Sequence, residues 1–369
     1  MTLTVDIGFM YWKILVITAK LYDNAMKALL MEEYKKLKFT DLPDPKIENS
    51  GDLLIRVKAV AICGSDVHGF DGSTGRRKPP IVMGHEAAGE VVETGKDVAA
   101  FKKGDRVTFD STIYCGQCFF CRQGMVNLCD NRMVLGVSCE EYRRHGAFAE
   151  YVVIPSRIAL LIPDGLSYEE AACTEPAAIA AHAVRLTPIA LNECTAVVGS
   201  GLIGNLVIQI LKISGSGIVL ALDTEPSRRE VAKSFGADAV FDPADPDLDR
   251  KIKDLTGGRG VDRVIEAVGA TEPIRTAVSI VRKGGSVTLV GNVSPAVEIP
   301  LQAVVSREIC LQGSCAISGE YPSVLDLMSR KKINVKALLS ATVPLCEGEV
   351  WMNRLYKREG DLLKVVLVP

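Results

Sequence analysis

The sequence has few of the features that point to nucleic acid, membrane or secretion. Its formal net charge is only −2 over 369 residues, so no basic surface argues for binding to nucleic acid or to an anionic membrane. It has no run of about 18 apolar residues, so we expect no membrane-spanning segment. It also lacks internal repeats and low-complexity tracts. These absences leave a folded globular chain, long enough for about two domains with sizeable cores.

Histidine is scarce, with four residues, whereas cysteine is plentiful, with eleven. An odd number of cysteines fits poorly with complete disulfide pairing, and no signal-peptide pattern is found, so we expect a reducing, cytoplasmic location. Six of the cysteines lie outside any metal-binding spacing and are expected to be small, mostly buried apolar residues. They are Cys139, Cys173, Cys194, Cys310, Cys315 and Cys346.

The first 25 residues do not follow the pattern of the rest. They contain a short apolar stretch, residues 14–19, flanked by Lys13 and Lys20, which is too short to span a bilayer. The regular pattern begins at Met26. We therefore interpret residues 1–25 as an extension without a functional role.

The pattern of expected secondary structure changes once along the chain. Short strand-like segments at residues 53–60, 90–93, 105–109 and 149–154, each near glycine-rich turns, predict a β-rich domain built as a partly closed barrel. From residue 168 onward, apolar strands alternate with helical segments, which predicts a doubly wound α/β fold with a parallel sheet. The expected helices are 168–185, 202–213 and 227–235, and the expected strands are 194–199, 217–222, 239–241, 261–266 and 286–290.

A glycine-rich loop, Gly199-Ser-Gly201-Leu202-Ile203-Gly204, joins the first of these strands to a helix. Such a loop lets the backbone approach a pyrophosphate at the helix N-terminus. Asp223, nineteen residues beyond Gly204, is placed to accept hydrogen bonds from the adenosine ribose, and its charge would repel the extra phosphate of NADP. We therefore predict NAD as the cofactor. Arg228 is expected either over the adenosine or as a solvated helix residue.

Four cysteines fall within fifteen residues, in the pattern Cys115-x2-Cys118-x2-Cys121-x7-Cys129. Four thiols and no other ligand suit a closed, structural zinc site. An iron–sulfur cluster is the alternative. In ferredoxins the third cysteine is followed by x3-Cys-Pro, whereas here seven residues separate Cys121 from Cys129, and Asp130 follows instead of proline.

A second metal site is predicted from two clusters, Cys63-Gly-Ser65-Asp-Val-His68 and Gly84-His85-Glu86. A thiolate and an imidazole are natural zinc ligands, and the third ligand is either Glu86 or Glu175. An open fourth position would accept an alcohol, zinc would acidify it, and hydride would pass to the nicotinamide. Ser65 and His68 are expected to relay the proton to solvent.

The motifs together resemble the zinc-containing medium-chain dehydrogenases. Gly84-His85-Glu86-Ala-Ala-Gly89, with Gly95 and Val98, is similar to the zinc signature of that family, and the resemblance covers nearly all of residues 26–369. It implies an α/β protein with a GroES-like catalytic domain at 26–177, to which 309–369 return, and a Rossmann domain at 178–308. It also implies a homo-oligomer, a dimer or tetramer, and a small-molecule alcohol as the other partner.

Within the family, the Cys63 cluster and Glu175-Pro176 resemble the sorbitol, or polyol, dehydrogenase branch. That likeness implies zinc held by Cys63, His85, Glu86 and water, with Glu175 close by. It places NAD contacts on Ile203, Asp223 and Arg228 and on the backbone around Val290-Gly291-Asn292.

The sequence departs from sorbitol dehydrogenase at two places. Gly69 stands where that enzyme has tyrosine, and Gly313-Ser-Cys-Ala316-Ile317 replaces Gly-x-x-Arg-Tyr, whose polar side chains help to hold the polyol. We therefore predict an NAD- and zinc-dependent dehydrogenase of a secondary alcohol or polyol other than sorbitol itself. The alternatives are an L-threonine 3-dehydrogenase-like enzyme, which usually carries threonine at the position of Ser65, and a sugar-phosphate (galactitol-phosphate-like) dehydrogenase, for which Arg76, Arg77 and Lys78 would receive the phosphate.

Overall fold

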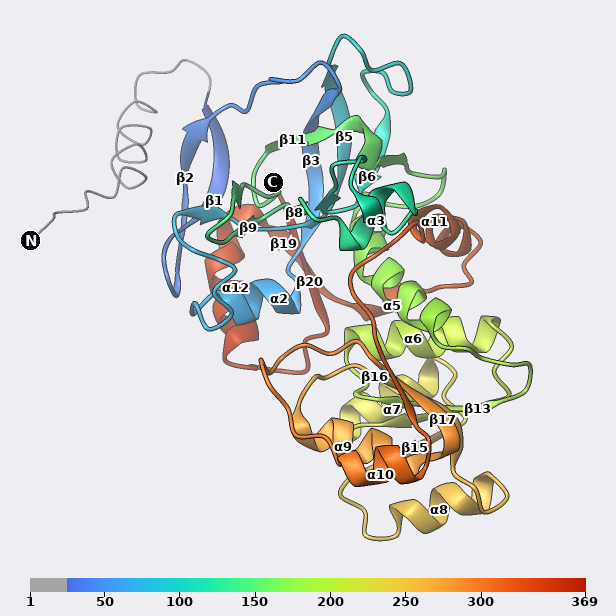
Figure 1. Cartoon of the computed structure of the whole chain (residues 1–369). Coiled ribbons are helices and arrows are strands. Elements are labelled where there is room, and N and C mark those ends of the chain that lie inside the picture. The colour runs from blue at the N-terminus through green and yellow to red at the C-terminus, as the bar shows by residue number, and fades with distance from the viewer. Residues whose placement is uncertain (1–24) are drawn as a thin grey trace, which may run out of the picture.

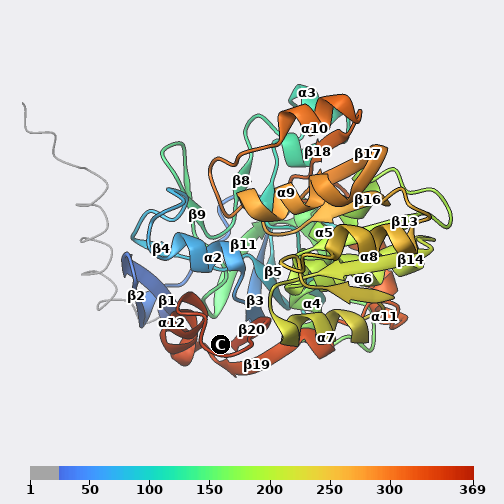
Figure 2. The same ribbon diagram turned by 90° about the horizontal axis from the view of Figure 1, so that it is seen from below.

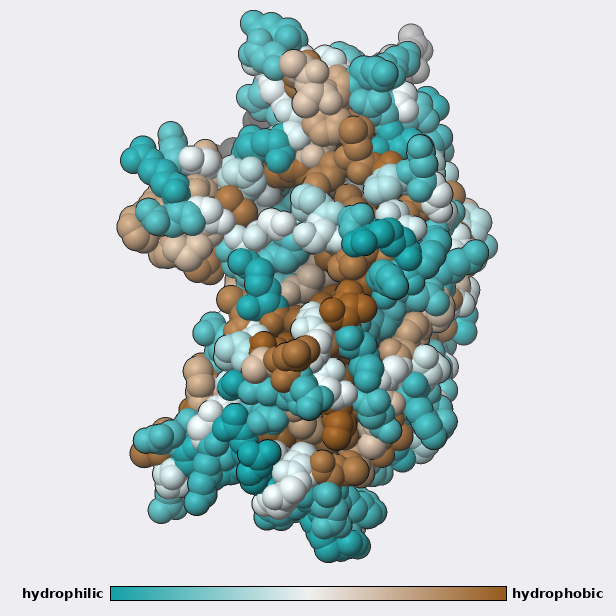
Figure 3. Space-filling view, turned by 90° about the vertical axis from the view of Figure 1, so that its right-hand side faces the viewer, coloured by the Kyte–Doolittle hydropathy of each residue, from teal (hydrophilic) through white to brown (hydrophobic). Residues whose placement is uncertain are grey.

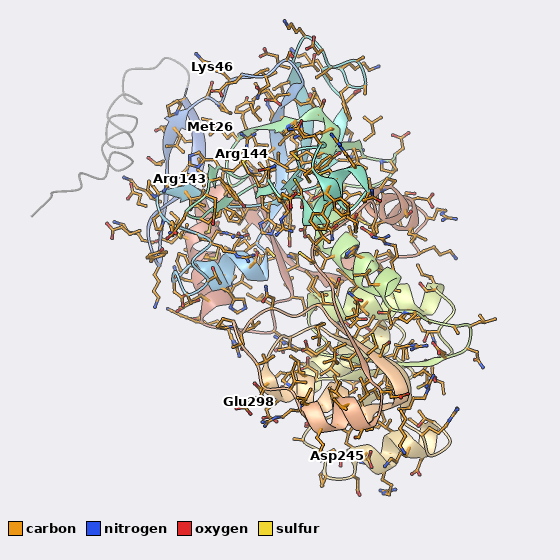
Figure 4. All side chains as sticks on the ribbon, in the orientation of Figure 1. Met26, Lys46, Arg143, Arg144, Asp245 and Glu298 are labelled. Atoms are coloured by element: carbon orange, nitrogen blue, oxygen red, sulfur yellow. The ribbon has the colours of Figure 1, made fainter. Side chains whose placement is uncertain are left out.

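The computed structural model describes residues 25–369. Two parts lie one above the other, a β-rich part and a sheet flanked by helices (Figure 1). Met26, Arg143 and Arg144 lie in the upper part and Asp245 and Glu298 in the lower part (Figure 4). The apolar stretch at residues 14–19 lies outside the described residues. Within 25–369, no helix is long and apolar enough to cross a membrane.

The β-rich part is built on a seven-stranded sheet in the order β12-β6-β5-β3-β20-β19, with β11 also paired to β3. Its main strands are β3 (Asp52–Ala61), β5 (Glu86–Thr94), β6 (Arg106–Phe109), β11 (Tyr151–Pro155), β12 (Ala159–Leu161), β19 (Leu339–Pro344) and β20 (Lys364–Val368). The four strands predicted from the sequence correspond to β3, β5, β6 and β11. The last of these begins at Tyr151, two residues after the predicted start.

Smaller elements surround this sheet. A three-stranded sheet joins β1 (Ala25–Glu33), β2 (Lys36–Pro43) and β4 (Ile81–Val82), and α12 (Gly348–Tyr356) lies beside it (Figure 2). The remaining elements are α2 (Gly64–Gly69), β7 (Thr112–Ile113), α3 (Phe119–Arg122), β8 (Met133–Val134), β9 (Val137–Ser138) and β10 (Arg143–Arg144). The register of β3 and β5 places Ala61 opposite Glu86, which brings together the two segments that carry the predicted zinc ligands.

The lower part is a parallel sheet in the order β15-β14-β13-β16-β17-β18, the order of a doubly wound dinucleotide-binding fold. Its strands are β13 (Cys194–Val198), β14 (Ile218–Leu222), β15 (Ala239–Phe241), β16 (Val261–Glu266), β17 (Val281–Leu289) and β18 (Cys310–Gly313). Its helices are α6 (Leu202–Ile213), α7 (Pro226–Ser234), α8 (Leu248–Leu255), α9 (Thr271–Ile280) and α10 (Leu301–Ser306). The α/β prediction with a parallel sheet is confirmed, and the sheet extends through β18 into the predicted returning segment.

The junction of the two parts corrects one prediction. The single helix expected over residues 168–185 is two helices, α4 (Tyr168–Ala172) and α5 (Thr174–Leu186), separated at Cys173. Pro176 lies in the first turn of α5, where a missing N–H costs nothing, but it could not continue a helix from α4. The break places Glu175 at the start of α5, beside the β-rich part.

One apolar core connects the two parts. It contains Ala59 from β3, Ala171 from α4, Val197 from β13, Leu206 from α6 and Val366 from β20. After β18 the chain passes through α11 (Tyr321–Ser329) back to β19 and β20, and β20 pairs with β3. This return delivers Lys364 to the interior of the β-rich part.

The prediction that six cysteines are buried is wrong for three of them. Cys173 is buried and Cys139 and Cys194 are partly buried, whereas the other three, Cys310, Cys315 and Cys346, are exposed. Cys310 lies on β18, the edge strand of the parallel sheet. On the face shown in Figure 3, brown hydrophobic residues lie in separate patches between teal hydrophilic ones.

Candidate metal centre and dinucleotide site

Cys63 lies just beyond β3 and caps the N-terminus of α2. Its Sγ accepts a hydrogen bond from the Ser65 amide at 3.4 Å, and the Asp66 carboxylate accepts one from the Cys63 amide at 3.3 Å. This reciprocal cap satisfies two amides that the short helix would leave free. The sulfur is thereby fixed at the end of the sheet, facing the start of β5.

His85 and Glu86 complete a three-residue group with Cys63. Both are buried, with exposures of 5% and 1%, and the ligand atoms of the three side chains all lie within 4.8 Å of one another. Burial lowers the pKa of the His85 imidazole, but Asp66 and Cys63 outweigh it and raise that pKa well above its usual range. The pocket therefore favours a positive charge at this point. A thiolate, an imidazole and a carboxylate that leave one position open fit a catalytic zinc ion.

Asp66 and Ser65 lie on either side of the His85 ring. The Asp66 Oδ1 atom is 3.5 Å from Nδ1, and the Ser65 Oγ atom is 3.4 Å from Nε2. Burial opposes the ionisation of Asp66, but His85 and Arg77 outweigh it and lower its pKa to about 2. Asp66 is therefore an anion that can orient the imidazole, as carboxylates do behind metal-bound histidines.

Glu86 forms a buried ion pair with Lys364 from β20. The Nζ atom is 2.6 Å from Glu86 Oε2 and donates a second hydrogen bond to the Ile62 carbonyl at 3.1 Å. Lys364 is only 2% exposed. Its burial favours the neutral amine, but Glu86 and Cys63 outweigh burial and raise its pKa. Glu86 thus keeps one oxygen, Oε1, for a metal ion.

Glu175 and His68 lie apart from this group. Glu175 is buried at 7% exposure but is not among the three residues whose ligand atoms converge. Burial, with contributions from Glu86 and Asp110, raises its pKa to about 8. His68 is exposed in the last turn of α2.

The four predicted thiols also converge, in a separate lobe of the β-rich part. The Sγ atoms of Cys115, Cys118, Cys121 and Cys129 lie within 4.8 Å of one another. Cys118 caps α3 by accepting the Cys121 amide at 3.5 Å, and Cys129 Sγ accepts the Cys115 amide at 3.3 Å. Backbone amides lower the pKa of Cys115 to about 6, whereas burial raises that of Cys121 to about 12. Four sulfurs fit a tetrahedral zinc ion, which would displace the remaining protons.

The glycine loop has the geometry of a dinucleotide site. A Cβ atom on Gly204 would lie 1.9 Å from the Gly199 carbonyl oxygen, whereas one on Gly201 would meet nothing within 4 Å. Gly204 thus permits close packing of α6, and Gly201 leaves open space at its N-terminus. The Ser200 Oγ atom is buried without a hydrogen-bond partner among the described residues, as expected beside a polar ligand.

Asp223 follows β14, and its Oδ2 atom accepts the Ser200 amide at 2.8 Å. This hydrogen bond holds the Asp223 carboxylate against the glycine loop. The carboxylate has further lone pairs that can accept a hydrogen bond from a ribose hydroxyl. Arg228 is half-buried in α7, whereas Arg229 is held by the Asp223 carbonyl at 2.7 Å. The remaining predicted contacts lie in α6 and just beyond β17. They are Leu202, Ile203, Val290, Gly291 and Asn292.

Three residues near the metal group were not assigned from the sequence. Asp66 lies inside the Cys63 motif, and its position three residues after the helix cap was a usable signal. Arg77, with Arg76 and Lys78, was a phosphate receptor only in the sugar-phosphate alternative, and exposed loop charges are the commoner meaning of such a run. Arg77 is instead 4% exposed and pairs with Asp66, and Lys78 pairs with Glu140 at 3.0 Å. Lys364 lies 278 residues from Glu86, and no local pattern indicates it.

Comparisons with known proteins find relatives over most of the chain. Residues 49–164 match the family described as Alcohol dehydrogenase GroES-like domain, and residues 203–330 match Zinc-binding dehydrogenase. Sorbitol dehydrogenase of Bacillus subtilis (strain 168) is 34% identical over 93% of this chain and 97% of its own length. D-arabitol-phosphate dehydrogenase of Enterococcus avium is 34% identical over 90% of this chain and 94% of its own.

A solved structure has the same fold. A zinc-binding dehydrogenase from Sinorhizobium meliloti 1021, bound to NADP, superposes with a TM-score of 0.86 at 31% identity, over 94% of this chain and 100% of that one. The likeness in sequence and structure extends over both parts of the chain. The protein therefore belongs to the zinc-containing medium-chain alcohol dehydrogenase family.

Proposed function

We propose that this protein is an NAD- and zinc-dependent dehydrogenase of a secondary alcohol or polyol, which it converts to the ketone or ketose. The observation that carries the proposal is the convergence of Cys63, His85 and Glu86 in a buried group, joined through a common core to a sheet with a dinucleotide loop. The relatives named for sorbitol and D-arabitol phosphate support a polyol as the substrate class.

The reaction is the loss of a hydride and a proton from one carbinol group. Zinc held by Cys63, His85 and Glu86 would polarise the alcohol oxygen, and the nicotinamide would accept the hydride. Ser65, with its Oγ atom 3.4 Å from His85 Nε2, is placed to take the hydroxyl proton. His68, exposed on the same helix, would pass it to solvent.

Glu175 has a different role in this proposal from that of Glu86. The ligand atoms of Cys63, His85 and Glu86 converge, and Glu175 is not part of that group. We therefore assign Glu86 as the third protein ligand and Glu175 as a neighbour of the reacting group.

The preference for NAD rests on Asp223. Its carboxylate is 8% exposed and faces the glycine loop, so a 2′-phosphate would be brought against a negative charge. The cytoplasmic location and the homo-oligomer, a dimer or tetramer, stay predictions from the sequence and its resemblance.

The proposal is tested by following reduced coenzyme with zinc-loaded protein on a panel of polyols, sugar phosphates, threonine and small diols, with NAD and with NADP. We expect turnover with one class of non-phosphorylated polyol or diol and a preference for NAD. Turnover only with threonine or a phosphorylated sugar would favour the alternatives, and inactivity of protein that holds both zinc ions and NAD would contradict this substrate class.

The coenzyme assignment has its own test. Asp223→Gly should weaken the binding of NAD and allow NADP to bind. The ratio of kcat/KM with NAD to kcat/KM with NADP should fall by about 10-fold or more, because the loss of one charge interaction of about 1.4 kcal/mol gives a factor of ten. Asp254→Asn, an exposed carboxylate on α8, is the matched control. An unchanged ratio in Asp223→Gly would show that this carboxylate does not read the ribose.

A further inference from the structure

Arg77 is a buried cation in the β-rich part that none of the roles above uses. Its side chain is about 5% exposed, and the Asp66 side chain beside it is fully buried. Its Nε and Nη2 atoms lie 3.2 and 3.1 Å from Asp66 Oδ1, and Nη2 also donates to Ser65 Oγ at 3.2 Å. A third nitrogen, Nη1, donates to the Arg76 carbonyl at 3.3 Å. The guanidinium is therefore fixed in position by partners on two segments.

Both side-chain partners of Arg77 lie against the same imidazole. Asp66 Oδ1 is 3.5 Å from His85 Nδ1, and Ser65 Oγ is 3.4 Å from His85 Nε2. The other carboxylate oxygen of Asp66 accepts the Cys63 amide at 3.3 Å. The Arg77 guanidinium thus holds the Asp66 carboxylate, which contacts two of the three predicted metal ligands, Cys63 and His85. It also holds the Ser65 hydroxyl, which lies next to His85 Nε2.

Gly69 provides the space that Arg77 occupies. A Cβ atom at residue 69 would lie 2.3 Å from Arg77 Cγ and 3.1 Å from Arg77 Cβ. Gly69 does not adopt a positive φ angle, so backbone conformation does not require glycine here. The requirement is steric: any larger residue, including the tyrosine of sorbitol dehydrogenase, would collide with the buried arginine.

We propose that Arg77 is a positioning residue of the catalytic metal site and that Gly69 is the small residue that admits it. Arg77 fixes Asp66 behind His85 and Cys63, and it fixes the Ser65 oxygen beside the open position. Because a guanidinium only donates hydrogen bonds, the Ser65 hydroxyl accepts from Arg77 and keeps one lone pair and its own proton for the proposed proton relay. This assignment rests on the proposed function for its kinetic part but not for its metal-binding part.

Lysine at position 77 separates the two tasks of the arginine. A lysine ammonium is a single charged point, without the planar fork that reaches two partners. We expect Arg77→Lys to preserve the charge beside Asp66 and therefore most of the zinc affinity, while it loses the bond to Ser65. Arg77→Ala should lose both, with a 10- to 100-fold weakening of the catalytic zinc, typical of residues behind metal ligands.

The test measures zinc release and steady-state kinetics in the full-length, zinc-loaded protein. The variants are Arg77→Lys, Arg77→Ala, Gly69→Ala and the double variant Gly69→Ala/Arg77→Ala, with Arg76→Ala, an exposed neighbour, as the control. A colorimetric chelator reports the loss of the weaker zinc ion, and fluorescence titration with NADH reports the coenzyme site. We expect faster zinc release and a lower kcat with unchanged NADH affinity in Arg77→Ala, and a lower kcat alone in Arg77→Lys.

Gly69→Ala provides a second line of evidence that does not depend on removing a buried charge. Because its methyl group displaces Arg77, this variant should share the zinc and kcat defects of Arg77→Ala, and the double variant should be little worse than either single one. Zinc release and kcat per bound zinc that match the Arg76→Ala control in Arg77→Ala and Gly69→Ala would overturn the proposal, as would fully additive defects. If no substrate is turned over by any protein, the zinc measurements still decide the assignment, and only the proposed function fails.

Discussion

The two metal-binding groups of this protein are built in opposite ways. The four thiols lie within fifteen residues of sequence and lie in a lobe where Phe119 is 68% exposed and backbone amides are the main partners of the sulfurs. Cys63, His85 and Glu86 lie at the adjoining ends of two strands that pair in the sheet, β3 and β5. Asp66 contacts His85 and is held by Arg77, and Lys364 pairs with Glu86.

In the proposed function, this difference separates a site that holds structure from one that performs chemistry. A closed set of four sulfurs leaves no position for a substrate and compensates for the small core of the lobe. The second group offers three different ligand types and an open position, and the surrounding charges fix each ligand in one orientation. The predictions below test that division.

The largest effect is expected from Cys63→Ala. Removal of the thiolate should lower kcat by about 10³-fold or more, because Lewis-acid stabilisation contributes several kcal/mol to such reactions. NADH affinity should be unchanged, since the coenzyme site lies on other elements. Cys139→Ala is the control, a partly buried cysteine outside both groups, and turnover of Cys63→Ala at its level would refute the catalytic assignment.

The buried pair of Glu86 and Lys364 should show the next largest effect, on stability. Lys364→Met leaves the Glu86 carboxylate without its cation and should destabilise the fold by about 3–5 kcal/mol, the usual cost of breaking a buried ion pair from one side. Adding Glu86→Gln removes the unpaired charge and should recover part of that loss. Urea unfolding with the catalytic site free of zinc measures both changes, and a double variant no more stable than Lys364→Met would contradict the pairing.

Cys129→Ser tests the other side of the comparison. It should reduce bound zinc from two ions per chain to one and make the lobe around residues 115–129 susceptible to protease. Turnover of the intact fraction should remain within about tenfold of the original, a change of about 1.4 kcal/mol. A loss of activity as large as that of Cys63→Ala, without unfolding, would show that the four-thiol site takes part in the chemistry.

The smallest effect concerns Asp110, near the base of the lobe. Burial raises the pKa of this carboxyl to about 6, with a further contribution from Glu320. Its pKa is higher in the folded than in the unfolded state, so stability falls as pH rises from about 4 to about 6, and the deficit persists at pH 7. Asp110→Asn should remove this dependence and stabilise the protein at pH 7 by about 1–2 kcal/mol, after allowance for partial exposure. An unchanged pH profile of the unfolding free energy would contradict the assignment.

The sequence predicted what depends on local pattern. The short strands, the parallel order and the glycine loop follow from periodicity and turn residues, and the four-thiol group follows from its spacing. It did not predict the break between α4 and α5, because alanine-rich residues on both sides of Cys173 have the same helical preference. The position of Pro176 was the missed signal.

The charged residues around Cys63, His85 and Glu86 could not be predicted from the sequence. Arg77 stands in a run of three basic residues that is typical of an exposed loop, and only packing against Gly69 and Asp66 shows that it is buried. Lys364 reaches Glu86 because β20 pairs with β3, a long-range pairing that no local pattern specifies. The choice between Glu86 and Glu175 depended on which carboxylate converges with Cys63 and His85 in space, which no local pattern specifies.

The central claim is tested most directly by anomalous diffraction at the zinc absorption edge from crystals of the zinc-loaded protein. Two peaks are predicted, one enclosed by the sulfurs of Cys115, Cys118, Cys121 and Cys129 and one between Cys63 Sγ, a ring nitrogen of His85 and Glu86 Oε1. A single peak in the four-thiol lobe after full zinc loading, or a second peak bound by Glu175 instead of Glu86, would contradict the account.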